Sequence, residues 1–407
     1  MINNVAYLSM HTSPLLQPGR GSAGGMNVYI DELAQTMARR GIEVVVFTRR
    51  TDPNRPTVVS PRPGYRVVHI TAGAPEELPM EVMPGLVPEF TEGVLSWIAR
   101  NEARFEVVHS HYWLSGWSGV LIKEILDIPL ANSFHTLGRI KDLTRRADEM
   151  PSSRMRTLTE DEVIAQSDCV IASTPYEFDD LMEHYGATPE RLCTSPPGID
   201  HRKFHPGDRD EARQWLGLGP EPIVLFAGRI QPLKGPDIAV AAVAQIELID
   251  APAPHLLIVG GPSGPDGDAE LRRVRQAATD LGIGDRVHCL APQPHAQLVA
   301  FYQAADVLIM PSRAESFGLV AAEAQACGLP VVAGAVGGLP YVVSDGVSGL
   351  LVDGQDPAGY ARALTKILGD PALTDHLSVG AVEFAAQFSW PSTADRLLEL
   401  YSGITGR

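Results

Sequence analysis

The sequence predicts an α/β protein in which two doubly wound parallel sheets face a central cleft. Short apolar runs alternate with helical patterns from end to end, and each run is apolar at nearly every position. Strands buried on both faces of a parallel sheet have this pattern. A stretch rich in turn-forming residues, at 196–220, separates two sets of runs. Ligand sites are therefore expected in the loops that follow strands along the cleft.

Six strands are expected in each half of the chain, with helices as the crossovers between parallel neighbours. The expected strands are residues 5–9, 44–48, 66–70, 107–110, 129–133, 169–173, 223–227, 256–259, 287–290, 307–310, 331–333 and 350–352. We expect residues 1–197 to form a first Rossmann-like domain and residues 198–389 a second. The last helical segment, at about 390–407, is expected to cross back to the first domain.

Composition limits the class of partner. The chain has 407 residues and a formal net charge of −16, so a nucleic acid or an anionic membrane is not expected. No apolar run reaches the roughly 18 residues of a membrane span and no signal peptide is recognisable, so a cytoplasmic protein is expected. The cysteines lack CxxC spacing and are expected to be buried free thiols. They are Cys169, Cys193, Cys289 and Cys327.

A glycine-rich loop follows the first expected strand and leads into a helix. Gly24 and Gly25 stand at the helix start, where small residues let the backbone approach a diphosphate. The alternative is a flexible connection without a ligand. The loop lacks the GxGxxG pattern, so a dinucleotide cofactor is not expected.

Histidines end two further expected strands. His109 and His111 are two residues apart and point to the same side of their strand, which suits either a metal or a pocket wall. A metal is disfavoured because no cysteine, aspartate or glutamate completes the set nearby. His135 ends the next strand, where cleft residues gather. Its alternative is a purely structural role.

Two cations open the second half of the chain. Arg229 and Lys234 follow the expected strand 223–227, and together they suit the charge of a diphosphate leaving group. The alternative is a solvated basic turn. Two DxD triplets, at 208–210 and 266–268, lie in turn-rich segments. We interpret them as chance occurrences and expect no bound metal.

Two glutamates flank the start of a later helix. Glu315 and Glu323 are eight residues apart, with Phe317, Gly318 and Leu319 between them. The free N–H groups of a helix start bind phosphate, and carboxylates accept hydrogen bonds from sugar hydroxyls. The segment therefore predicts a nucleotide-sugar site rather than the acid–nucleophile pair of a glycosidase.

Several separated motifs, in this order, resemble those of the family 4 retaining glycosyltransferases of the GT-B fold, over nearly the whole chain. The matching segments are residues 24–29, 228–229, 234–235, 315–319 and 323. Residues 9–14, 109–116 and 260–265 further resemble the D-inositol-3-phosphate glycosyltransferases that open mycothiol biosynthesis. The resemblance implies a UDP-sugar donor, a small-molecule acceptor, no cofactor or tightly bound metal, and a homodimer.

The resemblance also implies a role for each matching residue. The catalytic set would be His135, Arg229, Lys234 and Glu315. The donor diphosphate and ribose would contact Gly25, Arg229, Lys234, Phe317, Gly318, Leu319 and Glu323. The acceptor, bound by the first domain, would contact Asn27, Tyr112, Thr136 and Arg156.

One segment departs from that subfamily. Where residues 75–82 align, the subfamily carries a lysine that binds the acceptor phosphate, whereas Met80 stands there in this chain among three glutamates. Losing such a contact costs about 1.5–3 kcal/mol. The acceptor is therefore expected to be an unphosphorylated or cationic polyol, such as an aminocyclitol, unless other cations compensate for the lysine. The nearest candidates are Arg139, Lys141, Arg145 and Arg146.

We expect a retaining glycosyltransferase that moves a hexose, GlcNAc by analogy, from a UDP-sugar to a hydroxyl of inositol phosphate or a related polyol. The substitution would occur on one face of the sugar without a protein nucleophile. Two alternatives use the same two lobes: a nucleotide-sugar epimerase or hydrolase, and a sugar-nucleotide-binding protein without catalysis. Consumption of the donor without an acceptor would indicate the first alternative.

Overall fold

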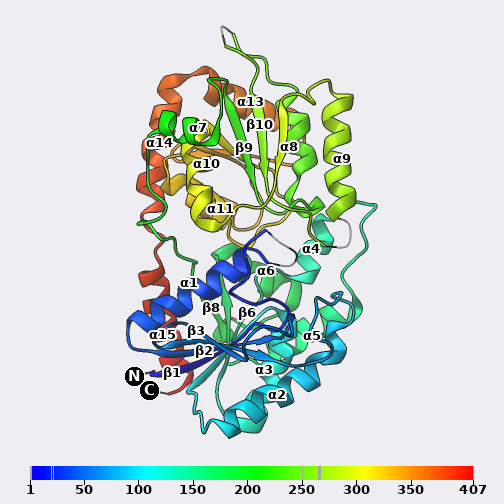
Figure 1. Ribbon diagram of the computed structural model, residues 1–407, viewed down its shortest axis with the longest axis vertical. Coiled ribbons are helices and arrows are strands. Elements are labelled where there is room, and N and C mark those ends of the chain that lie inside the picture. The colour runs from blue at the N-terminus through cyan, green and yellow to red at the C-terminus, as the bar shows by residue number, and fades with distance from the viewer. Residues whose placement is uncertain (1, 20, 22, 250, 265–266, 407) are drawn as a thin grey trace.

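Two sheets organise the chain into two lobes stacked along its longest axis (Figure 1). The computed structural model describes residues 2–19, 21, 23–249, 251–264 and 267–406. The first sheet has eight strands in the order β3-β4-β2-β1-β5-β6-β7-β8, and the second has six in the order β11-β10-β9-β12-β13-β14. Pairing is parallel except between β3 and β4. These are the two doubly wound sheets that the sequence predicts.

The strands are divided between the two sheets. The first sheet contains β1 (Asn4–Leu8), β2 (Glu43–Arg49), β3 (Val58–Arg62), β4 (Tyr65–Ile70), β5 (Val107–His111), β6 (Leu130–Ser133), β7 (Cys169–Ala172) and β8 (Leu192–Thr194). The second contains β9 (Ile223–Ala227), β10 (His255–Val259), β11 (Val287–Leu290), β12 (Val307–Met310), β13 (Val331–Gly334) and β14 (Gly349–Val352).

Helices connect these strands and cover both faces of each sheet (Figure 1). The first lobe has α1 (Gly25–Arg39), η1 (Met83–Leu86), α2 (Val87–Arg100), α3 (Trp113–Leu126), α4 (Gly138–Thr144), α5 (Arg154–Gln166), α6 (Pro175–Tyr185) and η2 (Pro189–Arg191). The rest are α7 (Arg209–Leu216), η3 (Pro232–Lys234), α8 (Pro236–Val243), α9 (Gly267–Asp280), η4 (His295–Gln297), α10 (Leu298–Ala304), α11 (Leu319–Ala326), α12 (Leu339–Val342), α13 (Pro357–Gly369), α14 (Pro371–Ala385) and α15 (Trp390–Ile404).

All twelve expected strands are present within one residue of their expected ends, whereas β3 and β8 were not expected. Strand β3 lies at the antiparallel edge of its sheet, contains Pro61 and has mostly exposed side chains. An edge strand of this kind lacks the apolar run that marks a buried one. Strand β8 has only three residues, which is too short for a periodic signal.

The last helix, α15, leaves the second lobe and packs on the first (Figure 1). Ser389 caps the helix, because its side chain accepts a hydrogen bond from the N–H of Ser392. Trp390 and Tyr401 are buried with Tyr7 of β1 in one core cluster. The chain therefore crosses between the lobes twice.

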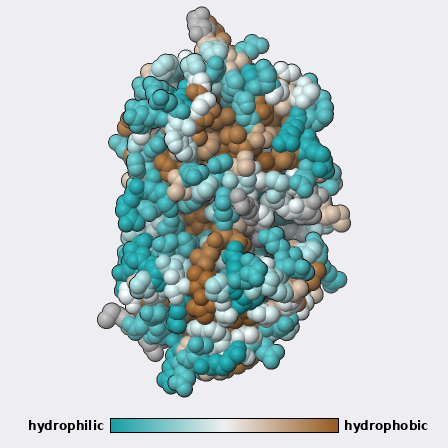
Figure 2. Space-filling model, in the orientation of Figure 1, coloured by the Kyte–Doolittle hydropathy of each residue, from teal (hydrophilic) through white to brown (hydrophobic). Residues whose placement is uncertain are grey.

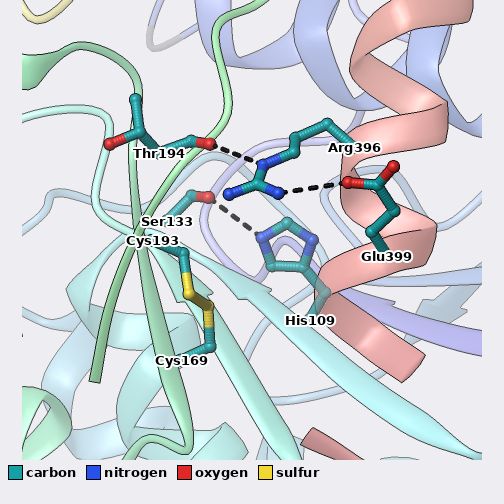
Figure 3. Close-up of a disulfide and its surroundings, with 7 residues drawn as sticks. All are labelled: His109, Ser133, Cys169, Cys193, Thr194, Arg396 and Glu399. Atoms are coloured by element: carbon teal, nitrogen blue, oxygen red, sulfur yellow. Dashed lines mark hydrogen bonds and ion pairs between the residues drawn. A yellow bond between two sulfur atoms is a disulfide. The ribbon is translucent and has the colours of Figure 1, made fainter. Parts of the chain in front are cut away.

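The cysteine prediction is wrong for one pair. Cys169 of β7 and Cys193 of β8 form a disulfide between neighbouring parallel strands (Figure 3). Their Cα atoms are 6.3 Å apart, within the range that a disulfide bridges. The sequence concealed this pair because β8 was not recognised. Cys289 and Cys327 are free thiols, as predicted, but only Cys327 is buried, because Cys289 is partly exposed.

Polar and apolar residues occupy different parts of the face shown in Figure 2. Figure 2 shows hydrophilic side chains around the rim of this face and apolar ones gathered over the middle of each lobe. Within the described ranges, every helix is too short or too polar to cross a bilayer.

Candidate functional site

The loop after β9 carries two cations into the space between the lobes. Arg229 follows the strand directly, and Lys234 ends the short helix η3. Gly235 has a φ of +66°, and a Cβ there would lie 2.2 Å from the carbonyl oxygen of Pro311. This tight turn therefore requires glycine. The ammonium of Lys234 forms an ion pair with the carboxylate of Glu315, which lies in the loop after β12.

Helix α11 begins four residues after Glu315. Gly318 caps it with a φ of +103°, and a Cβ there would lie 2.8 Å from the side chain of Leu339. Among the described residues, none accepts a hydrogen bond from the N–H groups of Phe317, Gly318 or Leu319. Free N–H groups and the positive end of a helix dipole together attract anions. Glu315, the acidic member of the ion pair, and this helix start thus lie in the same β12–α11 connection.

The glycine-rich loop of the first lobe touches the same region. A Cβ on Gly24 would come within 3.4 Å of Arg229 Nε, and a Cβ on Gly25 would come equally close to the side chain of Leu319. Burial lowers the pKa of Arg229, and the charge of Glu315 opposes that shift. The structure therefore brings together the predicted diphosphate residues from both lobes.

Glu323 lies on α11 with 5% of its surface exposed and is held from two sides. His295 Nε2 lies 2.6 Å from its Oε1, and the hydroxyl of Tyr302 donates to its Oε2 over 3.0 Å. Phe204 packs against both aromatic partners. Each carboxylate oxygen retains a lone pair, so Glu323 has capacity for a ribose hydroxyl. The sequence did not reveal His295 or Tyr302, which precede the glutamate by 28 and 21 residues.

Asn27 holds the glycine-rich loop in place. Its Oδ1 accepts a hydrogen bond from the N–H of Gly24 at 2.8 Å. Its Nδ2 donates to Thr12 Oγ1 at 2.8 Å and to the carbonyl of Ser13 at 2.7 Å. Only 1% of Asn27 is exposed. The observed contacts of this predicted acceptor residue are therefore all within its own loop.

His135 connects the two lobes. Its φ is +60°, which is unfavourable for a residue with a Cβ and indicates a conformation imposed by its surroundings. Its carbonyl accepts a hydrogen bond of 2.8 Å from the hydroxyl of Ser316, next to Glu315. Burial lowers the pKa of His135 to about 3, so its ring is neutral near pH 7.

The predicted acceptor residues Tyr112, Thr136 and Arg156 form one cluster. Arg156 Nη2 donates to the carbonyl and the hydroxyl of Thr136, at 2.9 and 3.2 Å. The guanidinium carbon lies 5.2 Å from the centre of the Tyr112 ring. Arg156 Nε donates to Glu160 Oε1 at 2.7 Å, and Glu160 also accepts from the N–H of Gly138. A buried carboxylate therefore fixes this arginine.

His11 links the acceptor cluster to Arg229. Its ring centre lies 4.5 Å from that of Tyr112. Burial, together with the positive charges of Arg229 and Arg156, lowers the pKa of His11 to about 3. Its Nδ1 is buried, without a hydrogen-bond partner in the described part of the chain. Sequence reasoning assigned no role to His11, although its place in the loop after β1 was a usable signal.

The segment 75–82 lies between β4 and η1, and Met80 is 36% exposed. Two of the four cations considered as compensation already have carboxylate partners. Arg139 pairs with Asp161 at 2.6 Å. Arg146 pairs with Glu270 of the second lobe at 2.8 Å, so it joins the lobes instead.

The remaining motifs are the two DxD triplets and the histidines of β5. Asp208 caps α7, because its side chain accepts hydrogen bonds from two N–H groups at the helix start. Asp266, in the second DxD triplet, lies outside the described residues. His109 is buried between Ser133 and Tyr401, at 3.0 and 2.6 Å (Figure 3 draws the first contact). Within the described ranges, no three histidine, cysteine or carboxylate side chains gather as a metal site.

Comparison with known families follows the division into lobes. Residues 23–203 match the family described as Glycosyltransferase Family 4, and residues 208–383 match Glycosyl transferases group 1. Two D-inositol 3-phosphate glycosyltransferases, from Actinosynnema mirum and Streptosporangium roseum, are 48% and 46% identical to this chain. The first alignment covers 98% of this chain and 97% of the relative, and the second covers 99% and 93%.

Solved structures show the same likeness. Sucrose-phosphate synthase from Thermosynechococcus elongatus is 35% identical, with a TM-score of 0.92 and 99% of each chain covered. Anabaena HepE, in complex with UDP and glucose, has a TM-score of 0.78 at 20% identity, covering 98% of this chain and 100% of its own. The second likeness concerns the fold alone.

Proposed function

Because this chain belongs to the family 4 glycosyltransferases, we propose that it transfers a sugar, GlcNAc by analogy, from a UDP-sugar to D-inositol 3-phosphate. Family membership favours a transferase over the two alternatives that the sequence left open, an epimerase or hydrolase and a binding protein without catalysis. The acceptor is the one named for relatives that share nearly the full length of this chain. Residues 1–197 would bind this acceptor, and residues 198–389 the donor.

The observation that carries the donor site is the ion pair of Lys234 and Glu315 beside the free N–H groups at 317–319. A diphosphate competes with Glu315 for Lys234 and also accepts hydrogen bonds from the helix start. The carboxylate is then released to accept hydrogen bonds from sugar hydroxyls. Arg229 adds a second positive charge, and Glu323 accepts from the ribose.

The proposed reaction uses these groups to stabilise the leaving diphosphate. The bond between the anomeric carbon and the phosphate oxygen breaks, while an acceptor oxygen forms a bond to that carbon on the same face. The acceptor proton passes to the departing phosphate oxygen. Arg229, Lys234 and the helix start stabilise the negative charge that develops. No protein side chain forms a covalent intermediate in this scheme.

Arg156 is the proposed ligand for the acceptor phosphate. Its charge is held next to Tyr112 and Thr136 by a buried carboxylate, so it is already oriented before the acceptor binds. Names of the curated relatives and of sucrose-phosphate synthase both specify a phosphate ester, which supports an anionic acceptor. Asn27 would act indirectly, by holding the loop that closes over the donor.

The test measures UDP release from UDP-GlcNAc with D-inositol 3-phosphate, myo-inositol, fructose 6-phosphate or no acceptor. We expect release above the background only with D-inositol 3-phosphate, and a product in which the anomeric configuration is retained. Equal release with myo-inositol would contradict phosphate recognition by Arg156 and return attention to Met80. If no acceptor raises release above the background, the acceptor assignment is wrong.

A further inference from the structure

A second histidine, His111, is buried next to His135. His111 is the last residue of β5 and is completely buried, whereas His135 is partly exposed. His111 Nδ1 lies 3.0 Å from His135 Nε2. The rings of Tyr7 and Tyr29 pack edge-on against His111, at 5.3 and 5.8 Å between centres. Within the described residues, the His111 ring makes its hydrogen bond to His135 alone.

Burial determines how the two rings share their protons. Desolvation lowers the pKa of His111 well below its usual value and that of His135 to about 3. Both rings are therefore neutral, and each carries one N–H. Of the two nitrogens between the rings, one must donate and the other must accept.

The remaining nitrogen of His111 decides which ring donates. His111 Nε2 is buried, with no hydrogen-bond partner among the described residues. A proton on Nε2 would be an unpaired buried N–H, which costs more than an unpaired lone pair. The proton therefore belongs on His111 Nδ1, which donates to His135 Nε2. The proton of His135 must then lie on Nδ1.

We propose that His111 is a positioning residue for the transfer reaction, because it fixes the ring and the tautomer of His135 and leaves His135 Nδ1–H as a donor at the cleft. The inference rests on the proposed function, since a sugar oxygen of the bound donor is the group that would accept this hydrogen bond. His135 needs such support because its backbone is held in the left-handed region at +60°. Ser316 fixes its main chain, and His111 fixes its side chain.

His109 provides a matched control on the same strand. It lies two residues before His111 and is equally buried, and the two rings are tilted against each other with centres 4.2 Å apart. Its nitrogens contact Ser133 and Tyr401 rather than His135. Replacing His109 therefore removes a buried histidine from β5 without removing the donor to His135.

The first experiment reads the tautomer directly in the whole protein with labelled histidine. Long-range proton–nitrogen spectra distinguish protonated from bare ring nitrogens, and the His135 signals are assigned by their absence in His135→Ala. We expect a protonated Nδ1 and a bare Nε2 for His135 in the wild type and in His109→Leu. A protonated His135 Nε2 in the wild type would overturn the proposal, whatever the enzyme's acceptor is.

The second experiment uses turnover with UDP-GlcNAc and D-inositol 3-phosphate. His111→Leu should lower kcat by about 10- to 100-fold with a smaller change in KM for the donor. His111→Asn should recover most of that loss, because its side-chain amide places an N–H near the position of Nδ1. In the His135→Ala background, His111→Leu should have little further effect. An equal loss in both backgrounds, or no recovery by asparagine in a folded variant, would contradict a role through His135.

Discussion

The proposed donor and acceptor sides of the molecule hold their charged groups in different ways. On the donor side, Lys234 pairs with Glu315, and both come from short loops beside a helix start with free N–H groups. On the acceptor side, Arg156 is fixed by the fully buried Glu160 and by the backbone of Thr136. The donor pair can be exchanged for a ligand, whereas the acceptor arginine is oriented in advance. Substitutions on the two sides should therefore affect different kinetic constants.

The largest effect is expected from Lys234→Ala. This change removes a cation that stabilises the leaving diphosphate, and we expect kcat to fall by about a thousandfold, or about 4 kcal/mol. Turnover with saturating donor and acceptor measures it. Arg209→Ala is the control, since Arg209 is a second-lobe cation paired with Asp306 and half-exposed. A similar loss in the control would show a general effect on the second lobe instead of a role at the diphosphate.

The second effect concerns acid stability and separates the lobes. Burial lowers the pKa of His11, His109 and His135 to about 3, and all three belong to the first lobe. The unfolded chain binds these protons below about pH 6.5, whereas the folded chain does not, so stability falls as the pH decreases from 6.5 toward 3. Glu177 has the opposite effect on stability. Burial raises its pKa to about 7, so on acidification the folded state binds this proton at a higher pH than the unfolded state does.

These three histidines, joined by His111, whose pKa burial also lowers, outweigh the single glutamate. We expect the free energy of unfolding to fall by about 2–3 kcal/mol between pH 6.5 and pH 5. Denaturant titrations at several pH values measure this. His109→Phe should reduce the slope of stability against pH, since one of the buried neutral rings is gone. Stability that stays constant, or rises on acidification, would contradict the neutral histidine cluster on the acceptor side.

The two sides also differ in how much of them could be predicted from the sequence. The connections after β9 and β12 carry Arg229, Lys234, Glu315 and the helix start, so a parallel-sheet pattern was enough to predict that they lie at one edge of the sheet. The fold class was predictable for the same reason, because buried parallel strands are continuous apolar runs. Both the fold class and the position of these residues follow from local sequence patterns, namely the apolar runs and the residues that come after them.

The missed features depend on contacts between distant segments. Glu160 reaches Gly138 across 22 residues, and Tyr302 reaches Glu323 across 21. Neither contact has a local pattern of its own. The disulfide was missed because it needs the unrecognised strand β8. The contacts of the Asn27 amide with Gly24 and Thr12 were likewise not foreseen, since side-chain direction depends on neighbours that only the fold supplies.

The third effect tests the pre-oriented arginine. Glu160→Gln removes the charge that holds Arg156, and we expect KM for the acceptor to rise by about 10- to 100-fold while KM for the donor changes little. Initial rates at varied acceptor concentration measure it. Glu162→Gln is the matched control, because Glu162 is exposed on the same helix, α5. An equal rise in KM for the donor would contradict the assignment of this cluster to the acceptor.

The smallest effect is expected from Tyr302, which supports the proposed ribose ligand Glu323 on the donor side. Tyr302 donates to Glu323, and burial with the neighbouring carboxylate raises the pKa of its hydroxyl well above the usual value, so the proton remains. Tyr302→Phe removes one hydrogen bond worth about 1 kcal/mol, and UDP should bind about fivefold more weakly. Calorimetric titration with UDP measures this. Tyr360→Phe is the control, since its hydroxyl contacts the carbonyl of Gly354 instead. Unchanged UDP affinity in Tyr302→Phe would show that Glu323 keeps its orientation through His295 alone.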